Sequence, residues 1–237
     1  MLMADLSRQI ARNLAEVRGR IAQAAAASGR APEAITLVAV TKYVGPPQIR
    51  ALVEAGCSLL GENRPQALWE KAAALDDLPI QWHMIGHLQR NKVRRTLPLV
   101  SMVQSADSQR LVEAIDRVAG ELGLAMPILL EVNVSGEPAK HGFAPDEVER
   151  VLEQVVRYTH VEVRGLMCMA GLEGGPERAR RDFAALRTLR DRLETVALPA
   201  VRLDELSMGM SGDYEAAIEE GATIVRIGSA LFEGVAG

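Results

Sequence analysis

The sequence predicts a (β/α)8 barrel, a TIM-type α/β fold in a single domain with an extra N-terminal helix. Short apolar runs rich in β-branched residues alternate with helical segments along the 237 residues. Such alternation is typical of a parallel sheet, because parallel neighbours need a crossover connection. Eight such units in about 200 residues favour a closed barrel over an open doubly wound sheet, the structural alternative.

The N-terminal segment has the period of an amphipathic helix. Apolar residues at spacings of three and four, from Leu2 to Ile21, share one helix face. Ser28 and Gly29 then end the helix. We expect residues 1–30 to form a helix that packs on the barrel of residues 31–237.

The eight expected strands are short apolar runs bounded by polar residues or glycines. Their near-continuous hydrophobicity indicates strands that are buried on both faces. The chain stops ten residues after Ile227, so we expect the N-terminal helix to cover that side of the barrel. The strands are expected over 35–41, 57–60, 80–85, 99–104, 128–134, 161–167, 203–207 and 223–227.

The helices between these strands carry recognisable start and stop signals. Pro46 and Pro65 stand at helix starts, Gly56 follows a helix end, and Pro98 stops the helix after the third strand. Asp107 or Ser108 caps the helix that runs to residue 122. The other helices are expected over 46–55, 65–75, 88–97, 145–158, 176–196 and 213–221.

Composition excludes several classes of protein. Hydrophobic residues make up 48% and charged residues 24%, which argues against a disordered chain. The net charge of −4 argues against a surface that coats nucleic acid. No run approaches the ~18 apolar residues of a membrane span, and charged residues such as Asp5 and Arg8 interrupt the segment where a signal peptide has its apolar core. Cys57 and Cys168 are too few for a disulfide framework, so we expect a reducing, cytoplasmic setting.

Candidate site residues gather where the expected strands end, which is where barrel active sites lie. Lys42 follows the apolar run LVAVT directly. Partial desolvation there would favour a neutral amine, which forms Schiff bases with aldehydes. Position alone favours the simpler interpretation, a lysine that reaches into solvent.

The turns after the seventh and eighth strands form a second candidate feature. SMGMSGD and RIGS combine glycines, hydroxyls and helix starts, whose backbone N–H groups can hold a phosphate. Ordinary turn chemistry explains the same residues equally well. Arg226 needs a partner for its charge, which could be a ring nitrogen, a phosphate oxygen, or a carboxylate such as Glu131 or Glu205.

No metal site is expected. His83 and His87 are four residues apart but span a strand end and a helix start, so packed, hydrogen-bonded histidines are the favoured interpretation. His141 and His160 carry no signal of their own. Arg90 to Arg95 form a basic stretch that we interpret as a solvated face rather than an RNA-binding patch.

Several motifs together resemble those of the pyridoxal-phosphate homeostasis proteins. Each motif is weak alone, but they occur in register from Ile35 to Gly234, nearly the whole chain. The family is a (β/α)8 barrel similar to the N-terminal domain of bacterial alanine racemase, and it carries pyridoxal 5′-phosphate (PLP) on a lysine. The motifs are LVAVTKY, GENR, WHMIGHLQRNK, LLEVNVSGEPAKHGF, GLMCMA, LSMGMSGDYEAAI and GATIVRIGSALF.

This resemblance implies roles for particular residues. Lys42 would be the Schiff-base lysine, and Arg226 the partner of the pyridine nitrogen. Pro65 departs from the family pattern and could bend the helix start near Asn63. The other implied positions are a phosphate cradle of Ser211, Gly228 and Ser229 with the Met210 backbone, ring-side walls of Asn63 and His83, and a pocket floor of Met167 and Asn133.

The implied cofactor raises the question of activity. An arginine beside the pyridine nitrogen cannot accept a proton, so the ring is a weak electron sink. Racemisation needs a second acid–base group, which relatives of this fold obtain from an added C-terminal domain that we do not expect in a chain ending at Gly237. We therefore expect a monomeric PLP carrier or buffer that supplies apo-enzymes, without nucleic-acid or membrane partners, rather than an enzyme. The alternatives are a PLP-dependent racemase-like enzyme and a sugar-phosphate barrel enzyme that forms an imine at Lys42.

Overall fold

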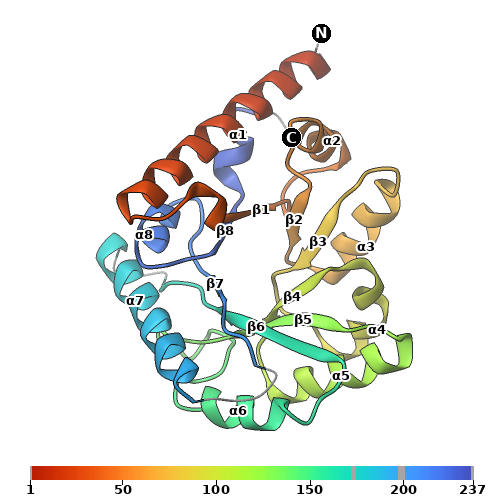
Figure 1. Ribbon diagram of the computed structural model, residues 1–237. Coiled ribbons are helices and arrows are strands. Elements are labelled where there is room, and N and C mark those ends of the chain that lie inside the picture. The colour runs from red at the N-terminus through yellow and green to blue at the C-terminus, as the bar shows by residue number, and fades with distance from the viewer. Residues whose placement is uncertain (1, 172–174, 197–200, 236–237) are drawn as a thin grey trace.

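The computed structural model describes residues 2–171, 175–196 and 201–235, and within them eight parallel strands close into a barrel (Figure 1). The strands follow one another around the barrel in chain order, and the first pairs with the last. The predicted fold class is confirmed. The strands are β1 Thr36–Val40, β2 Leu59–Glu62, β3 Gln81–Met84, β4 Met102–Ala106, β5 Met126–Glu131, β6 Val161–Met167, β7 Glu205–Ser207 and β8 Ile224–Ile227.

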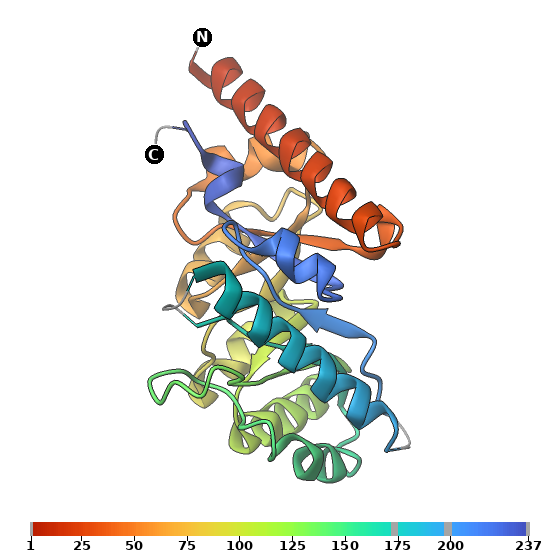
Figure 2. The same cartoon turned by 90° about the vertical axis from the view of Figure 1, so that its left-hand side faces the viewer.

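Helices follow the strands and surround the barrel (Figures 1 and 2). Pro46 and Pro65 begin their helices, as predicted, and Gly123 ends α5 in the left-handed conformation. None of the helices in the described part of the chain is both long and apolar enough to cross a membrane. The helices are α2 Pro46–Glu54, α3 Pro65–Ala74, α4 Val93–Thr96, α5 Gln109–Leu122, α6 Val148–Val155, α7 Gly175–Glu194 and α8 Tyr214–Glu219.

The N-terminal helix α1, Leu2–Ala27, lies against α2, α8 and the short helix η4, Ser229–Phe232 (Figure 1). Its buried face carries apolar residues such as Ile10 and Leu14. Asn13 donates hydrogen bonds from Nδ2 to the carbonyls of Leu231 (3.1 Å) and Glu233 (2.9 Å). The helix therefore covers the side of the barrel where β8 meets β1.

Several predicted elements differ from the structure in position or extent, among them the fifth and seventh strands, β5 Met126–Glu131 and β7 Glu205–Ser207, and the helix α6 Val148–Val155. Residues 88–97, predicted as one helix, form η2 Arg90–Lys92 and the single turn α4, and η3 Leu97–Leu99 follows. Pro98 cannot donate to a helical ladder, which keeps these turns short. β2 and β4 begin two or three residues later than predicted and end two residues later, at Glu62 and Ala106. Pairing with neighbouring strands, rather than apolarity, decides these boundaries.

The interior of the barrel contains an apolar layer of Val38, Leu129, Met167 and Ile224, each at most 2% exposed. Arg226 lies two residues beyond Ile224 on β8 and thus faces the same interior, nearer the C-terminal ends of the strands. The apolar layer closes the barrel, and polar groups occupy the level above it.

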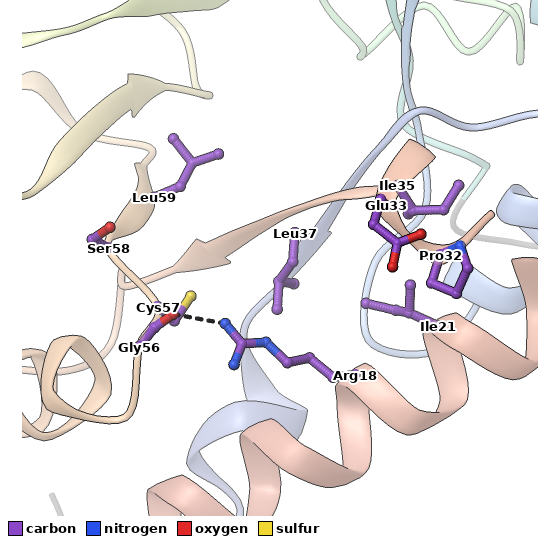
Figure 3. A pocket seen from close by; sticks show the side chains of 10 residues that line it. All are labelled: Arg18, Ile21, Pro32, Glu33, Ile35, Leu37, Gly56, Cys57, Ser58 and Leu59. Carbon is purple, nitrogen blue, oxygen red and sulfur yellow. Dashed lines mark hydrogen bonds between the residues drawn. The ribbon is translucent and has the colours of Figure 1, made fainter.

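A cavity of about 420 Å³ lies at the opposite end of the barrel, between α1 and the starts of β1 and β2 (Figure 3). Arg18 of α1 reaches across it and donates a hydrogen bond from Nη2 to the carbonyl of Gly56 at 2.7 Å. Ligand sites in barrels form at the C-terminal ends of the strands. We therefore assign this cavity to the junction between helix and barrel.

Gly165 lies where β6 and β7 approach each other closely. A Cβ atom at this position would lie 1.8 Å from the carbonyl oxygen of Glu205 on β7. We expect Gly165→Ala to lower the free energy of unfolding by about 1–3 kcal/mol, measured by urea denaturation. The control is Gly19→Ala in α1, where nothing lies within 4 Å of the added atom. That change should raise the free energy of unfolding by about 1 kcal/mol, and equal effects of the two variants would contradict the prediction.

Candidate functional site

Lys42 stands just beyond the end of β1, at the mouth of the barrel. Thr41 before it is fully buried, whereas Lys42 itself is exposed. Its Nζ lies 4.8 Å from the centre of the Tyr43 ring. The expected partial desolvation of Lys42 is wrong, because the last inward-facing residue of β1 is Val40 and the lysine side chain lies above the rim.

The backbone that carries Lys42 is held by a buried ion pair. Lys71 of α3 donates from Nζ to the Thr41 carbonyl at 2.7 Å and to Glu62 Oε2 at 2.6 Å. The Thr41 hydroxyl donates to the same carboxylate oxygen at 3.2 Å. The Lys71 and Glu62 side chains are 13% and 1% exposed, so water screens this pair little. These bonds anchor the strand end, and the Lys42 side chain lies exposed beyond it.

Six of the eight predicted site residues line one cavity of about 350 Å³ at this mouth. They come from the end of β1, the turn after β7 and the end of β8: Lys42, Met210, Ser211, Arg226, Gly228 and Ser229. A second cavity of about 540 Å³ adjoins it and shares Lys42, Met210 and Arg226. Asn63 lines only the second cavity. Parallel strands bring these segments together because their C-terminal ends meet at one rim.

The turns after β7 and β8 are joined by one hydroxyl. Ser211 Oγ accepts hydrogen bonds from the amides of Gly228 (3.2 Å) and Ala230 (3.4 Å). The Met210 amide donates instead to Asp213 Oδ1 at 2.6 Å. The Met210 N–H, which the resemblance assigns to the phosphate cradle, is therefore engaged within its own turn in this structure. Met210 offers the cavity a side chain that is 37% exposed.

Arg226 is buried inside the barrel and satisfied by neutral oxygens. Nη1 donates to Ser207 Oγ at 2.5 Å and Nη2 to the Cys168 carbonyl at 2.8 Å. Burial lowers the pKa of Arg226, and the charges of Cys168 and Glu131 act in the opposite direction. Neither Glu131 nor Glu205 forms an ion pair with Arg226 in the described part of the chain. The alternative of a direct salt bridge is thus not what the structure contains.

The Arg226 network continues across the barrel to His83. Ser207 Oγ donates to Gln104 Oε1 at 2.7 Å, and Gln104 Nε2 lies 2.8 Å from His83 Nδ1. An amide nitrogen can only donate, so Nδ1 accepts and the ring is neutral. Burial lowers the pKa of His83 to about 4, in agreement with a neutral imidazole.

Three residues implied to face the cofactor do not line either cavity. His83 is 7% exposed and belongs to the interior network, so it lines neither cavity, and its implied role as a ring-side wall stays a prediction. Met167 lies in the apolar layer, below the site. Asn133 donates from Nδ2 to the Glu137 carbonyl at 2.9 Å, within its own loop. The alternation of a strand sends His83 and Met167 into the barrel rather than to its mouth.

Asn63 reaches the site through a close approach of two loops. A Cβ atom at Gly86 would lie 2.3 Å from the Asn63 carbonyl oxygen. Pro65 takes the first position of α3, where its missing N–H costs nothing. Asn63 is half-buried at the wall of the larger cavity.

The remaining sequence candidates are structural. Cys57 and Cys168 are buried, and burial raises the pKa of the Cys168 thiol to about 12, so neither is a reactive thiol. In the basic stretch, Arg94 pairs with Glu121, and the Arg95 guanidinium lies 4.1 Å from the centre of the Trp69 ring. These contacts fit a solvated protein face.

A cluster that sequence reasoning missed lies at the same rim: His87, Asp107 and His141. They follow three different strands, so their spacing along the chain gives no signal. Glu131 lies buried nearby. Burial raises its pKa to about 7, and the charge of Asp107 adds to this shift, while Arg226 and His87 oppose it.

This fold, with a lysine after β1 facing the turns after β7 and β8, defines a barrel of the alanine racemase type. The family model "Alanine racemase, N-terminal domain" matches residues 8–235. The pyridoxal phosphate homeostasis protein of Aquifex aeolicus is 41% identical over 222 residues, which cover 92% of this chain and 95% of the relative. That of Pseudomonas aeruginosa is 42% identical over 226 residues, with 94% of each chain covered. The chain belongs to the pyridoxal phosphate homeostasis protein family.

A solved structure supports the same assignment. The structure of PipY from Synechococcus elongatus with PLP bound is 38% identical to this chain, with a TM-score of 0.83. The match covers 94% of this chain and 99% of PipY.

The neutral, buried His83 should make stability depend on pH. Its pKa is about 4 in the folded state against 6.5 for the ordinary group. The unfolded chain therefore binds an extra proton as the pH falls from 6.5 to 4, and folding loses up to about 3 kcal/mol at this position. We expect the wild type to lose stability relative to His83→Gln over this range, measured by urea unfolding at each pH. An unchanged difference would contradict the prediction, and His160→Gln, at an exposed histidine, is the control.

Proposed function

We propose that this chain binds PLP within residues 31–237 and acts in intracellular PLP homeostasis as a carrier or buffer. The observation that carries the proposal is one cavity that unites the Lys42 amine, the Arg226 guanidinium and the turns of Ser211 and Gly228. Membership of the family supports it, as does the PLP bound to PipY. The helix of residues 1–30 takes no part in this binding.

The donor set in the cavity fits PLP. Lys42 supplies an amine for the aldehyde, and the Ser211 hydroxyl, whose oxygen accepts from the amides of Gly228 and Ala230, has its own proton to donate to the phosphate. A Cβ atom at Gly228 would lie 3.3 Å from Val40, so glycine leaves the room that a side chain would fill. The cavity of about 350 Å³ has the size of a small-molecule site.

Arg226 sets the chemical character of the site. PLP, when bound, supplies an electrophilic carbon and an electron-withdrawing ring. A guanidinium has five N–H donors and no acceptor, and Arg226 uses two of its nitrogens on Ser207 and Cys168. Arg226 can donate to a ring nitrogen but cannot protonate it as an acid would, so it favours binding over strong carbanion chemistry.

The open mouth of the barrel favours a carrier over an enzyme. Lys42 is exposed, and Tyr43 beside it is 87% exposed, so water reaches the reactive amine. A racemase-like enzyme needs a second acid–base group across the substrate from the lysine. Tyr43 contacts the lysine itself, with its ring centre 4.8 Å from Lys42 Nζ, rather than facing it across a substrate-sized gap.

The recipients in this proposal are apo-forms of PLP-dependent enzymes. Tyr43, Met169 and Met210 are large apolar side chains that are exposed and line the two cavities. They offer an apolar rim on which a recipient can dock over the mouth. We propose that the chain acts as a monomer, because a monomer leaves the mouth of the barrel open to a recipient. We place it in the cytoplasm, where the recipient enzymes would be.

The first test is covalent retention of PLP. Wild-type protein mixed with PLP should acquire a visible absorbance band that remains after gel filtration, and Lys42→Ala should lack it. Lys92→Ala, at another lysine of the larger cavity, is the matched control and should keep the band. Ser211→Ala should retain the band but bind PLP about ten- to a hundredfold more weakly, because it loses a hydrogen bond to a charged group. A band that survives in Lys42→Ala would refute the assignment.

The second test separates carrier from catalyst. Loaded protein should restore activity to an apo-PLP enzyme faster than the same concentration of free PLP. Exchange of the α-proton of amino acids in deuterated water should stay far below the roughly 1 per second of ordinary enzymes. Exchange at that rate, abolished by Lys42→Ala, would favour the racemase-like alternative instead.

A further inference from the structure

Two histidines and a buried carboxylate meet at the rim of the barrel, beside the larger cavity. His87 follows β3, Asp107 follows β4, and His141 lies in the loop after β5. His87 Nδ1 lies 2.6 Å and His141 Nδ1 3.8 Å from Asp107 Oδ2. One ligand atom from each residue lies within 4.8 Å of the other two.

Negative charge lies beneath this cluster. The Asp107 side chain is 5% exposed, and Glu131 on the neighbouring strand β5 is 4% exposed. No side chain in the described part of the chain donates a hydrogen bond to the Glu131 carboxylate. The buried carboxylate of Asp107, which faces two imidazoles, is the group here that favours a cation.

Asp107 is oriented toward the histidines. Ser108 Oγ donates to Asp107 Oδ1 at 3.0 Å, which leaves Oδ2 for the two imidazoles. A hydrogen bond to one oxygen of a carboxylate is the kind of support that holds a metal ligand in place.

The loop that carries His141 is fixed to the barrel rim. The amide of Phe143 donates to the Glu131 carbonyl at 2.8 Å, and the Asn133 amide donates to the Phe143 carbonyl at 2.9 Å. Gly142 has a φ of +115°, and a Cβ atom there would lie 2.9 Å from the Asn133 nitrogen. This close approach holds the loop in place, and His141 Nδ1 lies 3.8 Å from Asp107 Oδ2 although its side chain is largely exposed.

We propose that His87, Asp107 and His141 bind a divalent transition-metal ion, of the class of Zn²⁺ or Co²⁺. Two imidazoles and one carboxylate are ligands that such ions prefer. Ligand atoms around a tetrahedral ion lie about 3.4 Å apart, between the 2.6 and 3.8 Å separations found here. The site rests on these three residues and does not depend on the proposed function.

Binding requires the imidazoles to turn. The two rings are stacked, with centres 4.4 Å apart and planes inclined by 15°, so their nitrogens do not yet point at one position. The side chains are 45% and 60% exposed, so they can rotate without disturbing the core. Three protein ligands leave a position for water or for an anionic oxygen of a molecule at the mouth, since His87 also lines the cavity of Lys42.

Titration of the full-length protein with Co²⁺ tests the site, because bound Co²⁺ reports its ligands through visible absorbance. We expect one equivalent to bind to chelator-treated wild type, and Zn²⁺ to displace it. His141→Ala and Asp107→Asn should each weaken binding by at least about tenfold. His160→Ala is the matched control. This half-exposed histidine lies beside Asp116 and is not part of the cluster, so its substitution should leave the affinity for Co²⁺ unchanged.

The result that overturns the proposal is equally specific. Absence of binding, or equal weakening by His141→Ala and His160→Ala, would show that the cluster is no metal site. The titration is repeated with Lys42→Ala, which should bind Co²⁺ as the wild type does. Loss of binding in that variant would place the ion on a molecule held at Lys42 and would also overturn the proposal.

Discussion

The buried charge of Arg226 constrains the whole upper half of the barrel. A guanidinium that is 4% exposed must be supplied with acceptors, and β6 and β7 provide them through the Cys168 carbonyl and the Ser207 hydroxyl. The hydroxyl needs its own acceptor, which Gln104 provides, and Gln104 then needs an acceptor in His83. One buried charge is therefore the start of a hydrogen-bonded chain of polar side chains on β8, β7, β4 and β3. The same residue lines both cavities, so the group that organises the interior network also borders the candidate site.

A buried ion pair between Lys71 and Glu62 anchors the backbone before Lys42 without contacting the Lys42 side chain. Lys71 and Glu62 hold the Thr41 carbonyl and hydroxyl below the rim, and removal of either partner would leave an uncompensated buried charge. The backbone of Lys42 is therefore fixed while its side chain remains exposed. An enzyme gains from a lysine held rigidly and away from water. A carrier gains from an amine that is placed accurately but stays accessible to a recipient.

Strand boundaries were predicted correctly where the apolar residues are also the ones that pair with a neighbouring strand. They were displaced where polar residues take part in the pairing. β6 was predicted residue for residue over Val161–Met167, whereas β2 was displaced because Glu62 is polar and still pairs with β3. Lys42 and the late turns could be found because each adjoins its strand. The sequence did not show that the His83 side chain points into the barrel, because that direction depends on the exact position of the residue within β3. The cluster at His87 could not be found, because only closure of the barrel brings loops after three strands together.

Kinship with the alanine racemase barrel settles the fold and leaves the chemistry to the site. One fold hosts many functions, so the reaction must be argued from the groups at the mouth. Here the Arg226 guanidinium donates hydrogen bonds and cannot accept a proton, and Lys42 is exposed at the mouth. These groups suit the binding of PLP, and they are the basis on which we propose a carrier.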